Sequence, residues 1–421
     1  MKPCGTIPAG FSAQDGVLVI GGHRVCDLVN ASAHDTPLFI YDFALIKERI
    51  AALRAALPQD VAVHYAMKAN PLPALVNAIA PLVDGVDVAS AGEMAVALAH
   101  GCEAAHISFA GPGKRVDELR AAIAAGVTLN LESEGEAERA LDISQSMVGP
   151  DGKPIVPRLA VRVNPDFDLR GSGMKMGGGA KPFGVDSDRV PALVKSLIAA
   201  GADWRGLHIY AGSQALDAEA IIECQAQTIK LAAQLGDAIG HAPPTVNLGG
   251  GFGLPYFSTD APLDVRRVGA GLQALLSARP ESLMATSFII ELGRYLVGEA
   301  GVYLTRIVDR KISHGQTFLV TDGGLHHQLA ASGNFGTVVR RNYPVAVASR
   351  FGQPATEQVT VVGCLCTPLD LLADQVMLPR ANVGDIVAIF MAGAYGASAS
   401  PVGFLGHPAP HEMIINDECT A

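Results

Sequence analysis

The stretch that decides the fold is HYAMKANPLPALVNAI, residues 64–79. Its first part, His64–Lys68, has the length of a buried strand, and the segment Pro73–Ile79 is rich in Ala and Leu at helical spacing. A strand followed directly by a helix is the repeating unit of a parallel sheet, because the helix carries the chain back to the starting edge.

This unit recurs from about residue 42 to about residue 294. The eight strand candidates are His64–Lys68, Val86–Ser90, Ile107–Ala110, Thr128–Leu131, Leu159–Asn164, Gly206–Tyr210, Val246–Leu248 and Phe288–Glu291. The clearest helical segments are Pro73–Ile79, Glu93–Ala99, Glu118–Ala125, Val190–Ala200 and Ala218–Ala238. Eight strand–helix units predict an α/β fold, a (β/α)8 barrel of the TIM type. A doubly wound open sheet is the alternative, which counting strands does not exclude.

Nearly every strand candidate ends in a polar or glycine cluster, such as Ser90-Ala-Gly92-Glu93 or Gly249-Gly250-Gly251. In a barrel these ends converge on one face, and that face holds the active site. The alternative is that the clusters are ordinary turn and helix-start signals.

After about residue 295 the pattern changes to strands with few helices. Val302–Val308, Thr317–Thr321, Gln358–Val362 and Ile386–Phe390 predict a second, antiparallel β domain, which Val17–Ile20 and Leu38–Tyr41 can join. We therefore predict a barrel over residues 42–294 and a discontinuous β domain over residues 1–41 and 295–421. The glycine-rich stretch 168–181 predicts a mobile loop, which either covers the site or is simply long.

Composition excludes several classes of protein. The net charge of −10, without a long basic run, argues against nucleic-acid binding. No signal peptide and no apolar stretch of membrane-spanning length is present, so we expect a cytoplasmic protein without a membrane partner. The seven cysteines have no repeated spacing and are expected to be reduced thiols. Cys364-Leu-Cys366 has no second Cys/His pair at ligand spacing, so no metal site is predicted.

Three groups of residues at the strand ends carry chemistry. A desolvated lysine at position 68 would offer the neutral amine that forms imines, although a surface lysine is the simpler interpretation. Gly249–Gly251 would let backbone N–H groups approach a phosphate, although a triple glycine is often only a turn. Glu291 and Arg294 would place charges at a cofactor, or form a structural salt bridge.

Eight motifs then occur in order from residue 64 to residue 396: HYAMKAN, DVASAGE, VRVNP, GLHIYAGSQ, NLGGGFG, ELGRY, GCLCTPLD and GAYG. Together they resemble the fold-type III decarboxylases that use pyridoxal 5′-phosphate (PLP), the alanine racemase-like barrel group. Diaminopimelate and ornithine decarboxylases belong to this group. Within it the chain is most similar to the pyridoxal-dependent decarboxylases of exosortase A systems, which look related to decarboxylases of carrier-protein-bound amino acids.

The resemblance implies a PLP-dependent amino-acid decarboxylase and a role for each matching residue. Lys68 would hold PLP as a Schiff base, and Glu291 would pair with the pyridine nitrogen. Arg162, Glu93 and His208 would lie around the cofactor, and the phosphate would be held by Gly249, Gly250, Gly251, Ser213, Arg294 and Tyr395. Cys366 would reach across a dimer interface and protonate the carbanion, which implies a homodimer with shared active sites and a β domain that contributes to both.

The departures from the family concern the substrate. Tyr210 stands where the family stacks a histidine on the PLP ring, and an aromatic phenol can still stack there. Thr367 replaces the glutamate expected after the inserted cysteine, and the stretch after Gly324 lacks the usual arginine. Asp370, Arg340 and Arg341 remain as candidate substrate contacts. These changes favour a carrier-bound or modified amino acid over free diaminopimelate, although diaminopimelate stays open.

Two other functions remain. An amino-acid racemase on the same barrel is one, but the Cys366-type insertion argues for decarboxylation. A non-catalytic PLP-binding regulatory protein is the other, and such relatives usually lose the lysine or the cysteine. His326 and His327 either line the pocket or are packed and neutral, and packing is the favoured interpretation.

Overall fold

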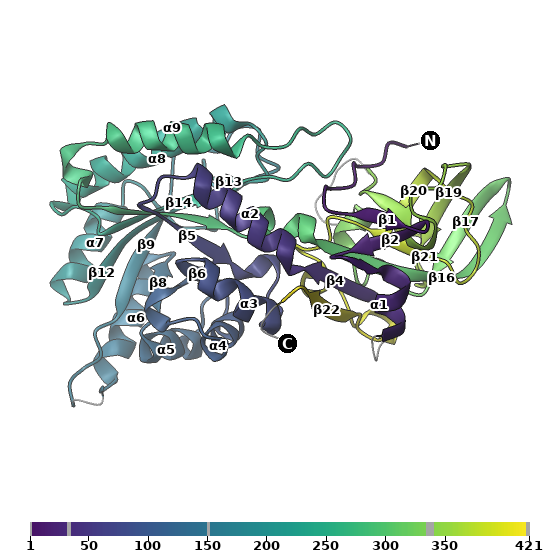
Figure 1. The fold of residues 1–421 in the computed structure, drawn as a ribbon. Helices are drawn as coiled ribbons and strands as arrows, with labels where there is room; N and C mark the ends of the chain where they lie inside the picture. Colours follow the sequence, from purple (N-terminus) through teal and green to yellow (C-terminus); the bar gives the residue numbers. More distant parts are fainter. Residues whose placement is uncertain (1, 32–34, 150–151, 334–340, 418–421) are drawn as a thin grey trace. The chain divides into compact units, whose positions relative to one another are not determined.

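The computed structural model describes residues 2–31, 35–149, 152–333 and 341–417 (Figure 1). The chain divides into two compact units. A barrel unit comprises residues 50–253 and 262–293, and a β unit comprises residues 1–49, 254–261 and 294–421. Among the described helices, none combines the length and the apolar character needed to cross a bilayer.

The barrel unit contains a closed ring of eight parallel strands. They are β5 (Val61–Ala66), β6 (Gly85–Val88), β7 (Ile107–Phe109), β8 (Thr128–Leu131), β9 (Arg158–Asn164), β12 (Asp203–Ile209), β14 (Thr245–Gly250) and β15 (Ser287–Leu292). Each strand pairs in parallel with the next in space, and β8 pairs with β9 to close the ring. All eight predicted strands are present, and closure excludes the open-sheet alternative. The predicted (β/α)8 barrel is confirmed.

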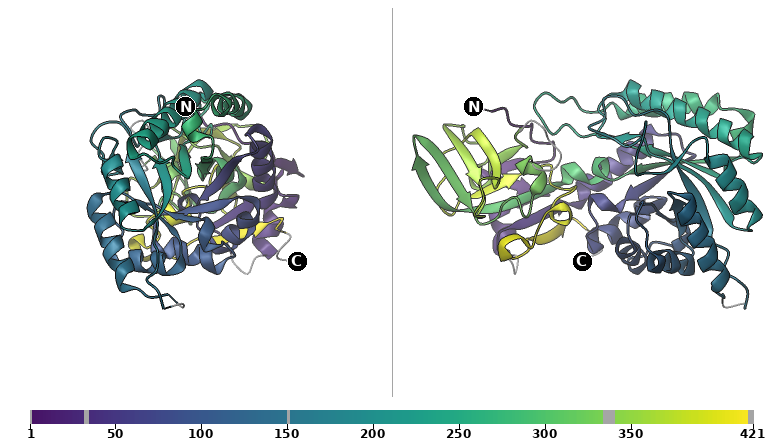
Figure 2. Two further views of the ribbon diagram at one scale, coloured as in Figure 1. Left: turned by 90° about the vertical axis from the view of Figure 1, so that its left-hand side faces the viewer. Right: turned by 180° about the vertical axis from the view of Figure 1, so that it is seen from behind.

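Helices lie outside these strands (Figure 2). They are α3 (Pro73–Ile79), α4 (Ala91–Ala99), α5 (Val116–Ala125), α6 (Glu134–Ser146), α7 (Val190–Ala199), α8 (Ala218–Ile239) and α9 (Val265–Ser277), and α2 (Phe43–Ala56) runs from the β unit into the barrel unit. The five predicted helices match α3, α4, α5, α7 and α8. The helices α2, α6 and α9 lie outside the five segments named from the sequence.

Some of the polar strand ends are helix caps. The hydroxyl of Ser90 accepts the N–H of Glu93 at the start of α4, and that of Ser133 accepts the N–H of Glu136 at the start of α6. A serine at this position satisfies one of the N–H groups that a helix leaves unpaired. At Ser90 and Ser133 the polar clusters are therefore helix-start signals, as the alternative interpretation proposed.

The β unit is built around an eight-stranded, mostly antiparallel sheet. Its strands are β4 (Leu38–Asp42), β16 (Gly301–Ser313), β17 (Gln316–Thr321), β18 (Val345–Val347), β19 (Glu357–Val362), β20 (Leu371–Leu378), β21 (Ile386–Ile389) and β22 (His411–Ile415). A small sheet of β1 (Ser12–Gln14), β2 (Val17–Ile20) and β3 (His23–Arg24), with helices α1 (Val25–Ala31) and α10 (Arg294–Val297), completes the unit. The β17–β19 and β4–β22 pairs are parallel, so the sheet is mixed.

The glycine-rich stretch 168–181 is anchored in the barrel unit. Within it β10 (Met174–Lys175) pairs with β13 (Gly212–Ser213). The strand β11 (Val185–Asp186) follows and pairs in parallel with the end of β9. The N–H of Gly173 also donates to the carbonyl of Ser213. The loop therefore lies beside Ser213, at the C-terminal ends of the strands.

A buried ion pair lies among the C-terminal ends of β7 and β8. Lys114 Nζ is 2.6 Å from Glu136 Oε1, and both side chains are almost fully buried. The same ammonium donates to the carbonyls of Gly111 and Asn130. Burial costs each ion several kcal/mol, and only this complete set of partners offsets that cost.

Replacing Lys114 by Met should therefore destabilise the protein strongly. Without its partner the Glu136 carboxylate would stay buried and unpaired, at a cost of about 3–5 kcal/mol in the free energy of unfolding. Urea unfolding monitored by circular dichroism measures this change. The matched control is Asp117→Asn, which removes an exposed partner of Arg115. A Lys114→Met protein as stable as that control would contradict the argument.

Candidate active site

Lys68 follows the strand β5 at the C-terminal end of the barrel. The predicted strand ran to Lys68, but β5 ends at Ala66 and residues 67–69 form a short 3-10 helix. This turn directs the lysine toward the barrel axis, where its Nζ lies 4.0 Å from Glu291 Oε1 and 5.1 Å from the centre of the Tyr210 ring. Lys68 is 43% exposed, so the amine can be reached from outside.

Glu291 is a buried carboxylate held by side chains from two other barrel strands. Its Oε2 lies 2.7 Å from His208 Nε2 on β12 and accepts a hydrogen bond of 3.2 Å from the amide of Asn247 on β14. Burial alone would raise the pKa of Glu291, but His208, Lys68 and Arg162 together outweigh it and lower that pKa to about 2. The barrel therefore presents a fixed negative charge beside the lysine.

The glycines after β14 form a close-packed turn. Gly249 and Gly251 have φ values of +69° and +73°, which favour glycine. A Cβ atom on Gly250 would overlap the backbone oxygen of Glu291, and one on Gly251 would overlap that of Gly212. Next to this turn the hydroxyl of Ser213 is buried without a hydrogen-bond partner. Bare backbone and an unpaired hydroxyl are what a phosphate would need here.

Arg162 and Glu93 lie at the same strand ends but have structural partners. Arg162 Nη1 is 2.8 Å from Glu132 Oε1, and its guanidinium lies over the Phe183 ring. Glu132 also accepts the N–H groups of Gly111 and Gly184, so it ties three loops together. Glu93 accepts the N–H of Ala89 at the start of α4, and burial raises its pKa despite the nearby Lys68 charge.

Sequence reasoning missed two residues that complete this arrangement. Asn247 lies in the NLGGG motif and orients Glu291. Glu132 directly follows β8, and it accepts a hydrogen bond from Arg162. A polar residue inside or directly after a buried strand was the available signal for both.

Arg294 and Tyr395 belong to the β unit. The Arg294 guanidinium donates to the hydroxyl of Tyr256 and lies 4.6 Å from the centre of the Tyr395 ring. Although burial would lower the pKa of Arg294, the surrounding tyrosines raise it, so the guanidinium stays charged. Tyr395 has a φ of +55°, an uncommon conformation for a residue with a side chain.

The loop after β19 carries Cys366 and Asp370. Cys366 is exposed, whereas Asp370 is buried and accepts the N–H groups of Leu325 and Leu365 at 2.7 and 2.8 Å. Both carboxylate oxygens of Asp370 therefore have backbone donors. Arg341 is exposed over the Phe257 ring, and Arg340 lies outside the described residues.

His326 and His327 are packed in the interior of the β unit. Both are buried, and burial, as the main cause, lowers the pKa of His327 and lowers that of His326 to about 4. Both rings are therefore neutral at pH 7, in agreement with the favoured interpretation.

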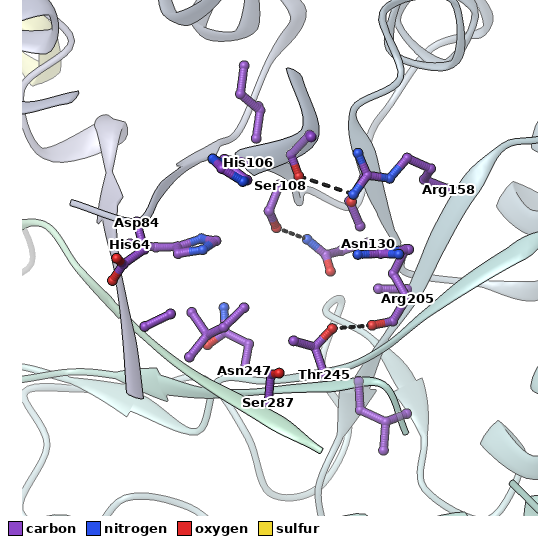
Figure 3. A pocket seen from close by; sticks show the side chains of 17 residues that line it. His64, Asp84, His106, Ser108, Asn130, Arg158, Arg205, Thr245, Asn247 and Ser287 are labelled. Atoms are coloured by element: carbon purple, nitrogen blue, oxygen red, sulfur yellow. Dashed lines mark hydrogen bonds between the residues drawn. The ribbon is translucent and has the colours of Figure 1, made fainter. Parts of the chain in front are cut away.

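A cavity of about 300 Å³ opens at the other end of the barrel (Figure 3). Its walls come from the first residues of the strands, including Thr128, Arg158 and Ser287. In this fold the N-terminal ends of the strands serve stability, whereas catalysis takes place at the C-terminal ends. The cavity is therefore separate from the Lys68–Glu291 site.

Comparison with known proteins identifies the family. The model of the pyridoxal-dependent decarboxylase, pyridoxal binding domain, matches residues 43–298. The chain belongs to the pyridoxal-dependent decarboxylases. It is 36% identical over 385 residues to the L-glutamyl-[BtrI acyl-carrier protein] decarboxylase of Niallia circulans, covering 90% of this chain and 89% of that protein.

Diaminopimelate decarboxylases are also similar. The protein from Methanothermobacter thermautotrophicus is 30% identical over 411 residues, covering 96% of this chain and 91% of the relative. The crystal structure of the enzyme from Helicobacter pylori, complexed with L-lysine, superposes with a TM-score of 0.79 at 27% identity and covers 92% of this chain and 93% of that one. The predicted family, the enzyme class and the PLP cofactor are thereby confirmed.

The residues of the barrel unit fit PLP. Lys68 would supply the amine and Glu291 the fixed carboxylate, and Gly249–Gly251 with Ser213 would form a cradle that a Cβ atom would fill. The chain is thus a PLP-dependent amino-acid decarboxylase. The individual roles of these residues stay predictions.

Replacing Gly250 by Ala should distort the cradle. The added Cβ would displace the backbone of Glu291, and overpacking of this kind costs about 1–3 kcal/mol. We expect a lower melting temperature and weaker PLP binding, measured by calorimetry and by fluorescence titration. Gly113→Ala is the control, because a Cβ there meets open space. Equal behaviour of the two variants would argue against the cradle.

Proposed function

We propose that the enzyme removes the α-carboxylate of an L-amino acid whose distal end is linked to a carrier protein or otherwise modified. The observation that carries this proposal is the set of hydrogen bonds made by Asp370. This residue is the acid that the loop after β19 shares with the family's pattern. Its oxygens already accept the N–H groups of Leu325 and Leu365, so it is committed to holding the loop. A free ammonium at the distal end would then lack the acidic partner that the family's pattern implies.

The relatives support this substrate class. The Niallia circulans relative acts on an L-glutamyl group carried by an acyl-carrier protein. Another relative, from Staphylococcus aureus, is 28% identical over 402 residues and is a 2-[(L-alanin-3-ylcarbamoyl)methyl]-2-hydroxybutanedioate decarboxylase. A carboxyl group joined to a carrier cannot leave as carbon dioxide. A glutamyl substrate would therefore be attached through its side-chain carboxyl group, with the α-carboxylate free.

PLP, when bound, supplies the electron sink for the electron pair left at Cα. Lys68 would bind the cofactor through its amine. Glu291, held by His208 and Asn247, would keep a proton on the ring nitrogen, because a fixed carboxylate favours the charged form. Tyr210 would stack on the ring, with Arg162 and Glu93 at its edge. Arg294 and Tyr395 stay proposed contacts of the phosphate.

Cys366 would return a proton to Cα in a partner subunit. The exposed thiol and the 59% exposed side chain of Leu369 in the same loop support a loop that is covered by a second copy. The active unit would then be a homodimer in which each site draws on two chains.

The substrate proposal is tested by offering purified, PLP-loaded enzyme two substrates. One is an L-glutamyl group linked through its side-chain carboxyl to an acyl-carrier protein, and the other is meso-diaminopimelate. Mass spectrometry should show loss of carbon dioxide from the carrier-bound group, with at least about 10²-fold higher kcat/KM than for meso-diaminopimelate, because the charged distal end of diaminopimelate would be bound without a partner. The Lys68→Ala enzyme is the control for uncatalysed loss.

Diaminopimelate is the second candidate, favoured by the 30% identity to decarboxylases of that amino acid. Rapid formation of lysine, with no turnover of the carrier-bound group, would favour it and overturn the first proposal.

The shared active site is tested by mixing two inactive variants. Lys68→Ala should lose covalent PLP and turnover, and Cys366→Ala should lose turnover but keep PLP. Random exchange of subunits should restore roughly a quarter of wild-type activity, because half of the dimers are mixed and each holds one intact site. A mixture that stays inactive after exchange, shown by native mass spectrometry, would contradict the shared site.

A further inference from the structure

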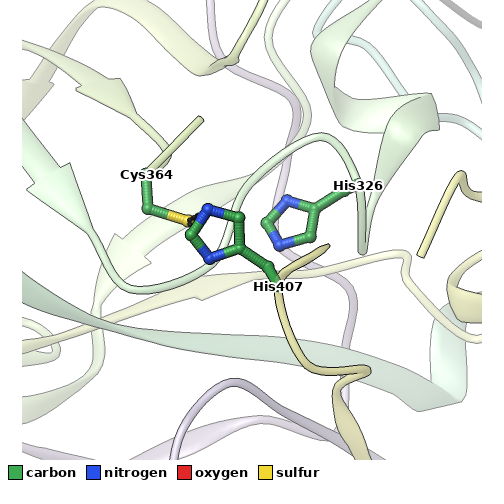
Figure 4. Close-up of side chains that lie close together, drawn as sticks. All are labelled: His326, Cys364 and His407. Carbon is green, nitrogen blue, oxygen red and sulfur yellow. Dashed lines mark hydrogen bonds between the residues drawn. The ribbon is translucent and has the colours of Figure 1, made fainter. Parts of the chain in front are cut away.

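Three side chains capable of binding a metal meet in the β unit (Figure 4). His326 comes from the loop after β17, Cys364 from the loop after β19, and His407 from the turn that precedes β22. One candidate ligand atom from each lies within 4.8 Å of the others. Cys364 Sγ is 3.7 Å from His407 Nδ1, and the two imidazole centres are 5.3 Å apart.

These separations are close to those of a tetrahedral site. Zinc bonds of about 2.0–2.3 Å to nitrogen and sulfur place neighbouring ligand atoms roughly 3.3–3.6 Å apart. Small rotations of the side chains would bring the three atoms to that spacing. Cys364 and His407 are half-buried, so the cluster can be reached from solvent.

The second observation is the state of His326. Its side chain is fully buried, yet neither ring nitrogen has a hydrogen-bond partner. A buried polar group without a partner is uncommon and requires a physical reason. The neighbouring His327 provides a contrast, since its nitrogens contact the Tyr303 hydroxyl and the Pro408 carbonyl. His327 therefore has a structural role, whereas the ring nitrogens of His326 are available to bind a ligand.

We propose that His326, Cys364 and His407 bind one zinc ion, with a fourth position open to water or another ligand. Two neutral imidazoles and a thiolate are the donor set that zinc takes in proteins. Binding forms one Zn–S and two Zn–N bonds and releases the thiol proton of Cys364 to solvent. This site was not predicted from the sequence, because its ligands lie 38 and 43 residues apart without paired spacing.

Asp370 holds the backbone next to two of the three ligands. Its carboxylate accepts the N–H of Leu325, next to His326, and the N–H of Leu365, next to Cys364. Gly324 and Gly363 leave room for it, because a Cβ atom on either would overlap the carboxylate. Such outer contacts orient the ligands of a metal. The ion would thus join the two loops and hold the segment that carries Cys366.

The test is metal binding by the full-length protein. Chelator-treated enzyme is titrated with Zn²⁺ in a calorimeter, and with Co²⁺ in a spectrophotometer, because a tetrahedral cobalt thiolate gives intense visible and near-ultraviolet bands. We expect one ion per chain and a higher melting temperature with zinc. Cys364→Ser and His407→Gln should lose the cobalt–thiolate bands and at least about tenfold in affinity.

Two controls separate this site from other ligands. Cys26→Ser removes a thiol elsewhere in the β unit, and Cys366→Ser removes the thiol two residues from Cys364; both should bind zinc like the wild type. Absence of stoichiometric binding by the wild type would overturn the proposal, as would equal binding by Cys364→Ser. Circular dichroism of each variant verifies that it is folded.

Discussion

The pairing of β8 with β9, which closes the barrel, is the constraint on which the site depends. Closure makes every strand end at the same rim, because all eight strands are parallel. Lys68, His208 and Glu291 are far apart in the chain, yet Lys68 Nζ lies 4.0 Å and His208 Nε2 2.7 Å from the Glu291 carboxylate. An open sheet would spread the same residues along an edge.

Within that rim the dominant interaction is the stabilisation of the buried Glu291 carboxylate by the groups around it. Glu291 is nearly inaccessible to water, and desolvation alone would favour its neutral form. His208, Lys68 and Arg162 reverse that preference and lower the pKa of Glu291. The outcome is a carboxylate fixed in position and charge before any ligand arrives, which is the form of preorganisation that catalysis requires.

The β unit shows how one carboxylate can connect two loops. Asp370 holds the backbone beside His326 and beside Cys364, so the loop with Cys366 is shaped by contacts inside this unit. The family's substrate contacts would come from this same loop. Its commitment to structure is consistent with a substrate that needs no charged partner at its distal end.

The sequence by itself determined the barrel, because strand and helix periodicities differ and eight repeats leave few folds to choose from. It also determined the family, since motifs such as HYAMKAN and NLGGGFG occur in a fixed order. Only the tertiary structure decided which polar strand ends are caps, as at Ser90 and Ser133, and which residue orients Glu291. It alone brought His326, Cys364 and His407 together. Contacts between distant segments depend on how the strands pair in the folded chain, and the spacing of residues within a short segment does not predict them.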